Sequence, residues 1–213
     1  MIFYETKQLI GLQFYCLHFL SYIFFHSHEG DKMRLWKTLK KETILDHNKF
    51  LKVEKHTIEL PDGRIVDNWP WIITPDYALV LPVTERRTLL MFHQTKYAVE
   101  GTSFAPVGGH LEPGEDPLAA AKRELREEMG CEAEEWIPFG SYRANGNNGG
   151  GMGHLYLALN ARKVCEPIID DLEEMELVEL TFDEAERKLL HGEIKVMGCV
   201  AMVAVGLLYL KRR

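Results

Sequence analysis

The chain has 213 residues and a formal net charge of -7, with 46% hydrophobic and 27% charged residues. These fractions are those of a globular protein and exclude a disordered chain. The negative charge argues against a stable nucleic-acid binder, which normally presents a basic face. A small anionic substrate stays compatible with it, because a bound cation can reverse the local field.

The cysteines also restrict the class of protein. They lie far apart and include no CxxC pair: Cys16, Cys131, Cys165 and Cys199. This spacing fits reduced thiols in a cytoplasmic protein better than a disulfide framework or a zinc site. We therefore expect a cytoplasmic location.

Residues 9–25, LIGLQFYCLHFLSYIFF, form a dense apolar run. Its length is close to the minimum for a membrane-spanning helix, about 17–25 residues. A signal peptide is not indicated, because Glu5 and Lys7 cancel and no small-residue cleavage site follows. Three interpretations of residues 1–32 stay open: a membrane anchor, an extra packed or dimer-forming helix, or sequence upstream of a true start at Met33. We expect membrane contact only from the first.

Residues 33–75 are expected to form an N-terminal hairpin region. Residues 52–60 alternate in polarity and are rich in β-formers. The turn sequence PDGR at 61–64 follows, and residues 65–73 resume as a second strand.

From residue 76 to 213 the predicted strands and helices alternate. Residues 78–83 and 88–93 are apolar runs typical of buried strands. Further strands are predicted at residues 135–142, 154–159 and 177–180. This alternation favours an α/β sandwich of a sheet and helices.

Two polar segments interrupt this pattern. Residues 143–153, rich in glycine and asparagine, are predicted to be a loop, either merely flexible or bringing backbone N–H groups to an anion. Residues 170–176 are predicted to be an acidic loop. Thr181 then begins a helix with Glu184 three positions on, as in a capping box, and this helix ends near residues 191–192.

The segment from residue 109 to 131, GHLEPGEDPLAAAKRELREEMGC, contains the acidic residues on which the functional prediction depends. Its residues 116–129 are good helix formers. On a helix, Glu124, Glu127 and Glu128 share one face. Their carboxylates repel one another unless a cation neutralises them, and Mg²⁺ or Mn²⁺ prefers such oxygen ligands. The alternative interpretation is a solvated acidic helix face.

The spacing of neighbouring residues decides between these two interpretations. The segment follows the pattern G-x5-E-x7-R-E-U-x-E-E-x-G-U, in which U is bulky and apolar, through Gly109, Glu115, Arg123, Glu124, Leu125, Glu127, Glu128 and Gly130. Cys131 replaces the last aliphatic residue, a mild departure because buried cysteine behaves as a small hydrophobe. This pattern is the Nudix box, and the chain resembles the Nudix hydrolases.

The resemblance implies an α/β (α+β) Nudix fold at residues 76–213, with a mixed β-sheet sandwiched between helices and an N-terminal β-hairpin extension at 33–75. It implies that the apolar segment 194–210 is a helix covering the sheet, although its length is also marginal for a second membrane span. The implied activity is metal-assisted attack of water on a nucleoside diphosphate linked to another moiety, with Mg²⁺ or Mn²⁺ as cofactor.

The resemblance assigns roles to residues of the box. Glu124, Glu127 and Glu128 would be metal ligands, and a carbonyl at Gly109 would complete the coordination. Glu127 and Glu128 are also catalytic candidates. Arg123 would pair with a neighbouring acid and fix its rotamer.

Other positions would support the site. Glu115 would stabilise the junction of loop and helix or share the metal shell, while Gly108 and Gly130 are supporting positions. The general base is a box glutamate in some relatives and a loop glutamate in others. Glu174 or Glu173 would supply the loop glutamate here, unless these residues belong to a solvated acidic loop.

Beyond the box, residues 51–210 resemble the ADP-ribose pyrophosphatase branch in the order of their elements. Two departures leave the metal number and the exact substrate open. That branch commonly has a metal-binding glutamate in an E-L-P-A-G run, where this chain has Ala105. It also often carries a proline where this chain has the glycine- and asparagine-rich segment 143–153.

Four residues are candidates for substrate binding. Lys96 and Arg143 can meet a phosphate, with surface solvation as the alternative. Trp71 and Phe104 can stack on a base or sugar, with core or dimer packing as the alternative. The expected partner is a small nucleotide, and a homodimer is an option.

The sequence thus predicts metal-dependent hydrolysis of ADP-ribose or a related nucleoside diphosphate sugar. The alternatives are a Nudix enzyme for a nucleoside triphosphate, a dinucleoside polyphosphate or coenzyme A, and a non-catalytic module that senses a nucleotide. The intact acids argue against the last, because a pure binder needs no three metal-ready carboxylates.

Overall fold

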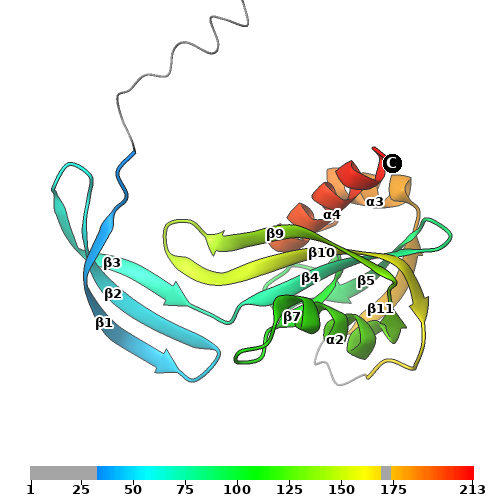
Figure 1. The fold of residues 1–213 in the computed structure, drawn as a ribbon, viewed down its shortest axis with the longest axis horizontal. Coiled ribbons are helices and arrows are strands. Elements are labelled where there is room, and N and C mark those ends of the chain that lie inside the picture. Colours follow the sequence, from blue (N-terminus) through cyan, green and yellow to red (C-terminus); the bar gives the residue numbers. More distant parts are fainter. Residues whose placement is uncertain (1–32, 169–173) are drawn as a thin grey trace, which may run out of the picture.

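The computed structural model describes residues 33–168 and 174–213, which form a sheet with helices on both sides (Figure 1). The strands are β1 (Lys37–His47), β2 (Leu51–Glu59), β3 (Ile65–Ile73), β4 (Tyr77–Thr84), β5 (Leu89–Thr95), β6 (Thr102–Ala105), β7 (Val107–His110), β8 (Cys131–Glu132), β9 (Glu135–Asn145), β10 (Gly149–Lys163) and β11 (Met175–Leu180). The helices are α2 (Pro117–Met129), α3 (Phe182–Leu190) and α4 (Met197–Leu210).

The main path of the sheet runs β1-β2-β3-β10-β4-β5-β11 within the described residues. Strand β10 is parallel to β3 and β4 and antiparallel to β9, so the sheet is mixed. Strands β6 and β7 pair with β5 and β4. This arrangement places β7, which enters the Nudix-box segment, beside the centre of the sheet.

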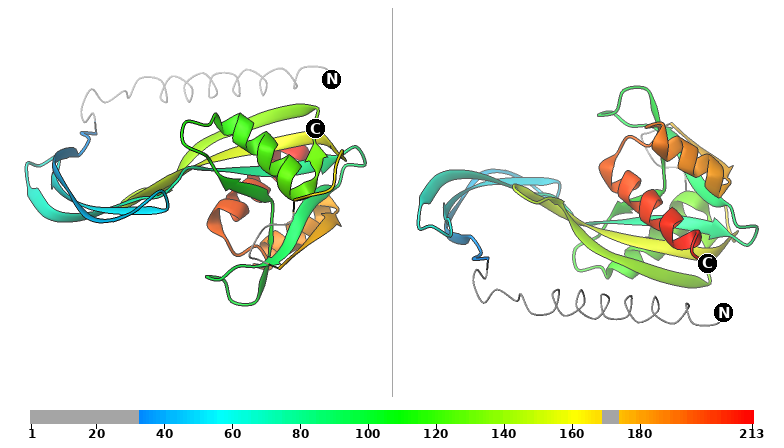
Figure 2. Two further views of the ribbon diagram at one scale, coloured as in Figure 1. Left: turned by 90° about the horizontal axis from the view of Figure 1, so that it is seen from below. Right: turned by 90° about the horizontal axis from the view of Figure 1, so that it is seen from above.

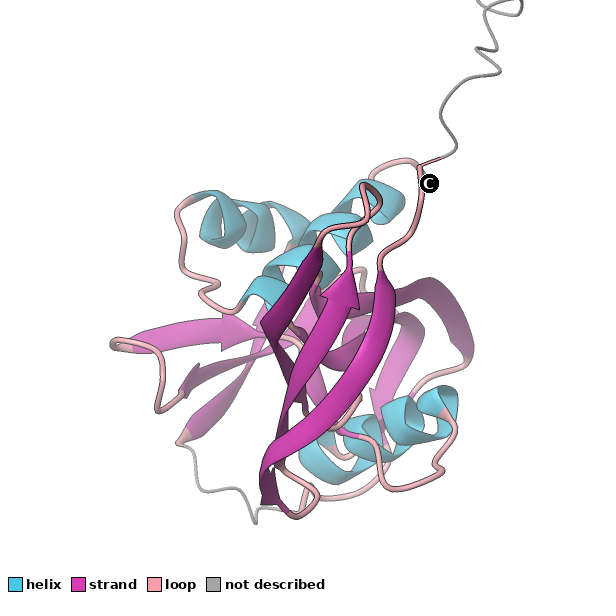
Figure 3. Ribbon diagram, turned by 90° about the vertical axis from the view of Figure 1, so that its left-hand side faces the viewer, coloured by secondary structure: helices cyan, strands magenta, loops and turns pink. Residues whose placement is uncertain are grey.

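Helix α2 covers one face of the sheet, and helices α3 and α4 cover the other (Figures 2 and 3). Successive residues of a strand point to opposite faces. Val80 accordingly packs with Leu125 of α2, whereas Leu81 packs with Met202 and Val203 of α4. Burial on both faces explains the continuous apolar run of β4. The expected sheet between helices is confirmed.

The ends of α2 are fixed by residues that the box motif contains or adjoins. The Asp116 carboxylate caps the helix by accepting hydrogen bonds from the amides of Leu118 and Ala119, both at 3.0 Å. Gly130 ends the helix in the left-handed conformation, with a φ of 64°. The helix predicted from residue 116 to 129 is therefore confirmed.

The C-terminal helices also agree with the sequence. Thr181 and Glu184 form the predicted capping box, and α3 ends at Leu190. Helix α4 lies against the sheet, where a Cβ at Gly206 would be 2.4 Å from Leu81 Cδ2. Within the described residues, no helix has the length and apolar character needed to cross a membrane.

The N-terminal region contains one strand more than expected. The predicted hairpin is present as β2 and β3, and β1 pairs antiparallel with β2 as a third strand. All residues of β1 are exposed, so its sequence lacks the alternation that marks a half-buried strand. The three strands extend from the layered body (Figure 1). The apolar run at residues 9–25 lies outside the described residues.

The prediction of a loop at residues 143–153 is wrong. Strands β9 and β10 continue through most of it as a hairpin that turns at residues 146–148. Its glycines permit close packing, because a Cβ at Gly151 would be 2.0 Å from the Pro75 carbonyl oxygen, and one at Gly149 would be 2.7 Å from that of Ile72. The segment predicted to be an acidic loop up to residue 176 ends earlier, because Met175 already belongs to β11.

We predict that Gly130→Ala lowers the free energy of unfolding by about 3 kcal/mol or more. Alanine would be strained at this positive φ, and its Cβ would be 2.2 Å from the Cys165 carbonyl oxygen. Gly114→Ala is the matched control, because Gly114 also has a positive φ (79°) but no atom lies within 4 Å of its Cβ position. It should cost only the strain, about 1–2 kcal/mol. Urea unfolding of both variants measures the difference, and equal losses would contradict the packing role.

Candidate active site

The end of strand β7 and helix α2 approach each other closely at Gly109. A Cβ on Gly109 would be 2.3 Å from Glu124 Oε1, so only glycine leaves room for this carboxylate beside the strand. A Cβ on Gly108 would be 2.2 Å from the Ala78 carbonyl oxygen of β4. The two glycines therefore allow strand, sheet and acidic helix to meet.

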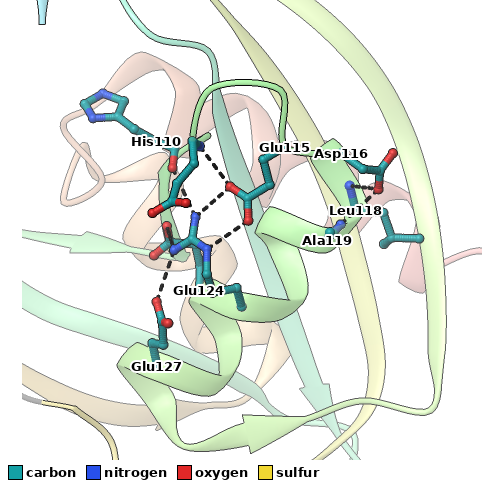
Figure 4. A network of polar contacts seen from close by, with 9 residues as sticks. His110, Glu115, Asp116, Leu118, Ala119, Glu124 and Glu127 are labelled. Atoms are coloured by element: carbon teal, nitrogen blue, oxygen red, sulfur yellow. Dashed lines mark hydrogen bonds and ion pairs between the residues drawn. The ribbon is translucent and has the colours of Figure 1, made fainter. Parts of the chain in front are cut away.

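The guanidinium of Arg123 lies at the centre of the box. Its Nε and Nη2 donate to the two carboxylate oxygens of Glu115 at 2.9 and 3.0 Å. Its Nη1 donates to Glu124 Oε1 at 2.8 Å and to Glu127 Oε2 at 3.1 Å. Nη2 also donates to the His110 carbonyl oxygen at 3.2 Å. Figure 4 shows the three carboxylates converging on this one side chain.

These contacts determine the charges of the box. Burial raises the pKa of Glu124, whose residue is 7% exposed, and Arg123 opposes this rise. The hydrogen bond from Arg123 lowers the pKa of Glu115. The bond to Glu115 is likewise the main cause that raises the pKa of Arg123 itself. Arg123 thus favours the ionised form of the buried Glu124, whereas burial and the charges of Glu127 and Glu115 oppose it.

A pocket of about 500 Å³ adjoins the acidic helix face. Glu124, Glu128 and Gly109 line one side of it. Further lining residues come from the end of β5 and the residue after it, and from the start of α4 and the residue before it: Gln94, Lys96, Val196, Gly198 and Cys199. Glu127 does not line this pocket; its side chain is 43% exposed and contacts Arg123. Of the three predicted metal ligands Glu124, Glu127 and Glu128, the first and last therefore line a common pocket.

A second pocket, of about 870 Å³, lies beside the same loop. It is lined by Lys49 and Phe50 from the β1–β2 turn and by Glu115 and Arg123 from the box. Glu124 and Glu128 do not line it. We therefore take the smaller pocket, which is lined by Glu124 and Glu128, as the candidate active site.

The donor set of the smaller pocket suits a hard cation. Glu124 and Glu128 offer carboxylate oxygens, and Gly109 brings backbone close to them. Within residues 33–168 and 174–213, however, no group of three or more His, Cys, Asp or Glu side chains is arranged to hold a metal. Ala105 lines the same pocket with a methyl group and adds no carboxylate. The residues present therefore fit a divalent ion held by two carboxylates.

The predicted substrate residues separate in space. Lys96 lines the pocket of the acids. Phe104 stacks on His93, with a centroid distance of 4.6 Å, and carries the Lys188 ammonium 3.8 Å from its ring centroid. Phe104 is absent from the lining of this pocket.

Trp71 and Arg143 lie elsewhere again. Trp71 stacks on the buried His56 of β2, with centroids 5.3 Å apart. Arg143 donates a hydrogen bond of 2.8 Å to the Gly150 carbonyl oxygen within the β9–β10 hairpin. Neither residue lines the pocket of Glu124 and Glu128.

Of the two loop glutamates predicted as the general base, the structure describes only Glu174. The Glu174 carbonyl oxygen accepts a hydrogen bond of 3.0 Å from the Thr95 amide, just before β11. Met175, the next residue, lines the pocket. Glu173 lies outside the described residues. The chain thus brings the backbone of Glu174 to the edge of the site.

The lining residues that sequence reasoning missed include Gln94, Val196, Gly198 and Cys199. Burial raises the pKa of the Cys199 thiol to about 11, so this cysteine stays protonated at neutral pH. Gln94 was open to prediction, because it lies two residues after Phe92 on the same face of β5, just before Lys96. The residues of α4 gave no local signal, since only the fold brings them to the box.

Comparison with known proteins agrees with this geometry. A family model described as NUDIX domain matches residues 74–197, more than half of the chain. A model described as nucleoside diphosphate sugar hydrolase N-terminal domain matches residues 36–72.

Three curated proteins are similar in sequence. The methanol dehydrogenase activator of Bacillus methanolicus is 32% identical over 70% of this chain and 80% of its own length. The CMP-5'-(N-acetyl-N-hydroxy-3-aminopropyl)phosphonate hydrolase of Streptomyces rubellomurinus is 28% identical over 78% of each chain. The ADP-ribose pyrophosphatase of Bacillus subtilis is 29% identical over 74% of this chain and 85% of its own.

A solved structure of an ADP compounds hydrolase shares the fold. It aligns with a TM-score of 0.72 and 17% identity, covering 86% of this chain and 98% of that one. Together with the box residues that converge on Arg123 and the family match over residues 74–197, this establishes that the chain belongs to the Nudix hydrolase family.

Proposed function

We propose that this protein is a divalent-metal-dependent pyrophosphatase that acts on ADP-ribose or a related nucleoside diphosphate sugar. One observation carries the proposal: Glu124 and Glu128 line one pocket beside Gly109, while Arg123 holds Glu124 in place. Two of the similar curated proteins are named as hydrolysing a nucleotide joined to another group, ADP-ribose in one case and a CMP phosphonate in the other.

Glu124, Glu128 and the Gly109 carbonyl would hold the Mg²⁺ or Mn²⁺ ion, and Glu127, which lies outside this pocket, would join them only by leaving its contact with Arg123. A bound divalent ion would neutralise the phosphates, orient them and acidify a water. The box segment itself supplies the rigidity that this chemistry needs. Arg123 fixes the Glu124 rotamer, and Gly109 leaves room for the carboxylate.

The remaining roles follow from position. Glu128 lines the pocket and would accept the proton of the attacking water, with Glu127 and Glu174 as the other candidates for this base. Lys96, which follows β5, would place positive charge near the substrate phosphates. Trp71, Phe104 and Arg143 would contact the substrate only where it extends beyond this pocket.

Ala105 stands where the ADP-ribose pyrophosphatase branch commonly has a glutamate, and this difference supports a second candidate class of substrate. A methyl group replaces the acid that relatives commonly have at this place, and the pocket then offers two carboxylates instead of three. A nucleoside triphosphate, a dinucleoside polyphosphate or coenzyme A remains the alternative, as does a sensing role. The full chain with Mg²⁺ or Mn²⁺ and a panel of these compounds separates the classes through release of AMP, phosphate or pyrophosphate. Cleavage of none would support sensing.

We predict that Glu128→Gln lowers turnover of ADP-ribose by roughly a hundredfold or more, because the variant loses a charge needed to hold the metal. The substitution keeps the size of the side chain, so its melting temperature should stay close to wild type. Glu132→Gln is the control, since Glu132 lies just beyond the helix and pairs with the exposed Arg126. Wild-type turnover in Glu128→Gln would refute the assigned role.

We predict that Arg123→Gln lowers the free energy of unfolding by about 1–3 kcal/mol, because it removes the donor shared by Glu115, Glu124 and Glu127. Turnover should fall as well, since the Glu124 carboxylate is no longer held in place. Arg126→Gln on the same helix breaks only an exposed ion pair and should change stability by no more than about 0.5 kcal/mol. Thermal and urea unfolding compare the two, and an equal effect would contradict the central position of Arg123.

A further inference from the structure

The wall opposite the carboxylates is formed by the beginning of helix α4. Val196, Gly198 and Cys199 line the pocket there. Val196 is the N-cap residue, with an extended φ of -104° and ψ of 124°, and its apolar side chain provides no capping hydrogen bond. The Val200 amide donates a hydrogen bond to the Val196 carbonyl oxygen at 2.9 Å, as the first bond of the helix. The amides of the three residues before Val200 therefore have no acceptor within the helix.

The electrostatic character of this turn favours an anion. Aligned peptide dipoles make a helix N-terminus positive, and its first amides point outward as donors. The first turn of α4 contains no acidic residue that would use them. Gly198 presents its amide without a side chain, and a Cβ there would lie only 3.2 Å from Leu79 Cδ1 and 3.3 Å from Tyr77 Oη.

A second and independent feature of the same pocket is Gln94. The residue is only 6% exposed and lines the pocket, yet its carboxamide makes no hydrogen bond to any described residue. None of the fully buried side-chain nitrogen or oxygen atoms in the described part of the chain lacks a partner. Because the Gln94 carboxamide has no such partner, its polar atoms are not fully buried and are exposed to the pocket. Since buried polar groups are normally satisfied, this carboxamide is available to hydrogen-bond a ligand in the pocket.

We propose that Gln94 and the first turn of α4 form a subsite for an oxyanion, namely the phosphate of a sugar phosphate. Glu124 and Glu128 repel an anion from the opposite wall, whereas the amides of α4 and the Gln94 NH₂ group donate to it. Lys96 lines the same space and adds positive charge. A role for this subsite in hydrolysis rests on the proposed function, but binding itself does not.

Metal-free binding tests the subsite apart from catalysis. Calorimetry of the full chain with EDTA measures ribose 5-phosphate, with ribose as the uncharged comparison and inorganic phosphate as competitor. We expect ribose 5-phosphate to bind one site and ribose not to bind. Displacement by inorganic phosphate assigns the affinity to the phosphate group alone; a failure to displace assigns it to the joined sugar and phosphate. Absence of ribose 5-phosphate binding would overturn the proposal.

Val196→Asp tests the helix terminus. The new carboxylate would accept hydrogen bonds from the α4 amides and repel the ligand, so binding should weaken roughly tenfold or more. The melting temperature should not fall, because aspartate is a preferred N-cap residue. Val196→Thr caps the amides without charge and should weaken binding less. Leu190→Asp adds the same charge at an exposed position of α3 and should leave binding unchanged. Wild-type affinity in Val196→Asp would contradict the subsite.

Gln94→Leu tests the carboxamide. Binding of ribose 5-phosphate should weaken, while the melting temperature stays the same or rises, because an unbonded amide is replaced by an apolar group of similar size. A clear loss of stability, with affinity unchanged, would show that Gln94 is structural and overturn its assignment.

Hydrolysis of ADP-ribose with Mg²⁺ separates the two proposals. Turnover without ribose 5-phosphate binding refutes the subsite alone, and binding without turnover refutes the proposed function alone. Glu128→Gln should lose turnover and retain metal-free binding, since Glu128 lies on the opposite wall.

Discussion

The multiple hydrogen bonds of Arg123 are the interaction on which the site depends. One guanidinium joins Glu115 before the helix, Glu124 and Glu127 on it, and the His110 carbonyl at the end of β7. Arginine suits this position because it stays charged and offers five donors in a fixed plane. The carboxylates would otherwise repel one another. Loop, strand and helix are thereby held in a single arrangement before any ligand binds.

The rest of the fold places this cluster against an enclosed space. Asp116 and Gly130 fix the two ends of α2, and Gly109 lets Glu124 approach the sheet. Helix α4, packed on the opposite face, directs its first turn toward the same pocket. The pocket is therefore lined both by carboxylates and by the first turn of α4, whose amides we propose as donors. Such polarity suits a substrate whose phosphates are shared between a cation and the protein backbone.

Features encoded by local spacing were predictable from the sequence. The box helix, the Arg123–acid contacts, the buried strand β4 and the capping box of α3 each depend on residues close in the chain. Strand β1 was not predictable, because it is exposed throughout. Gly149 and Gly151 suggested a loop, although contact with Ile72 and Pro75 explains them. The distances of Trp71, Phe104 and Arg143 from the acids, like the approach of α4, arise only from the tertiary fold.

Binding of Mn²⁺ tests the central claim most directly, because its electron paramagnetic resonance signal reports the free ion without any assay of turnover. The account predicts that the full chain depletes this signal and that a Glu124→Gln/Glu128→Gln double variant, folded as judged by circular dichroism, does not. Equal depletion by the wild type and the double variant, or no depletion by the wild type, would contradict a metal site on these two carboxylates.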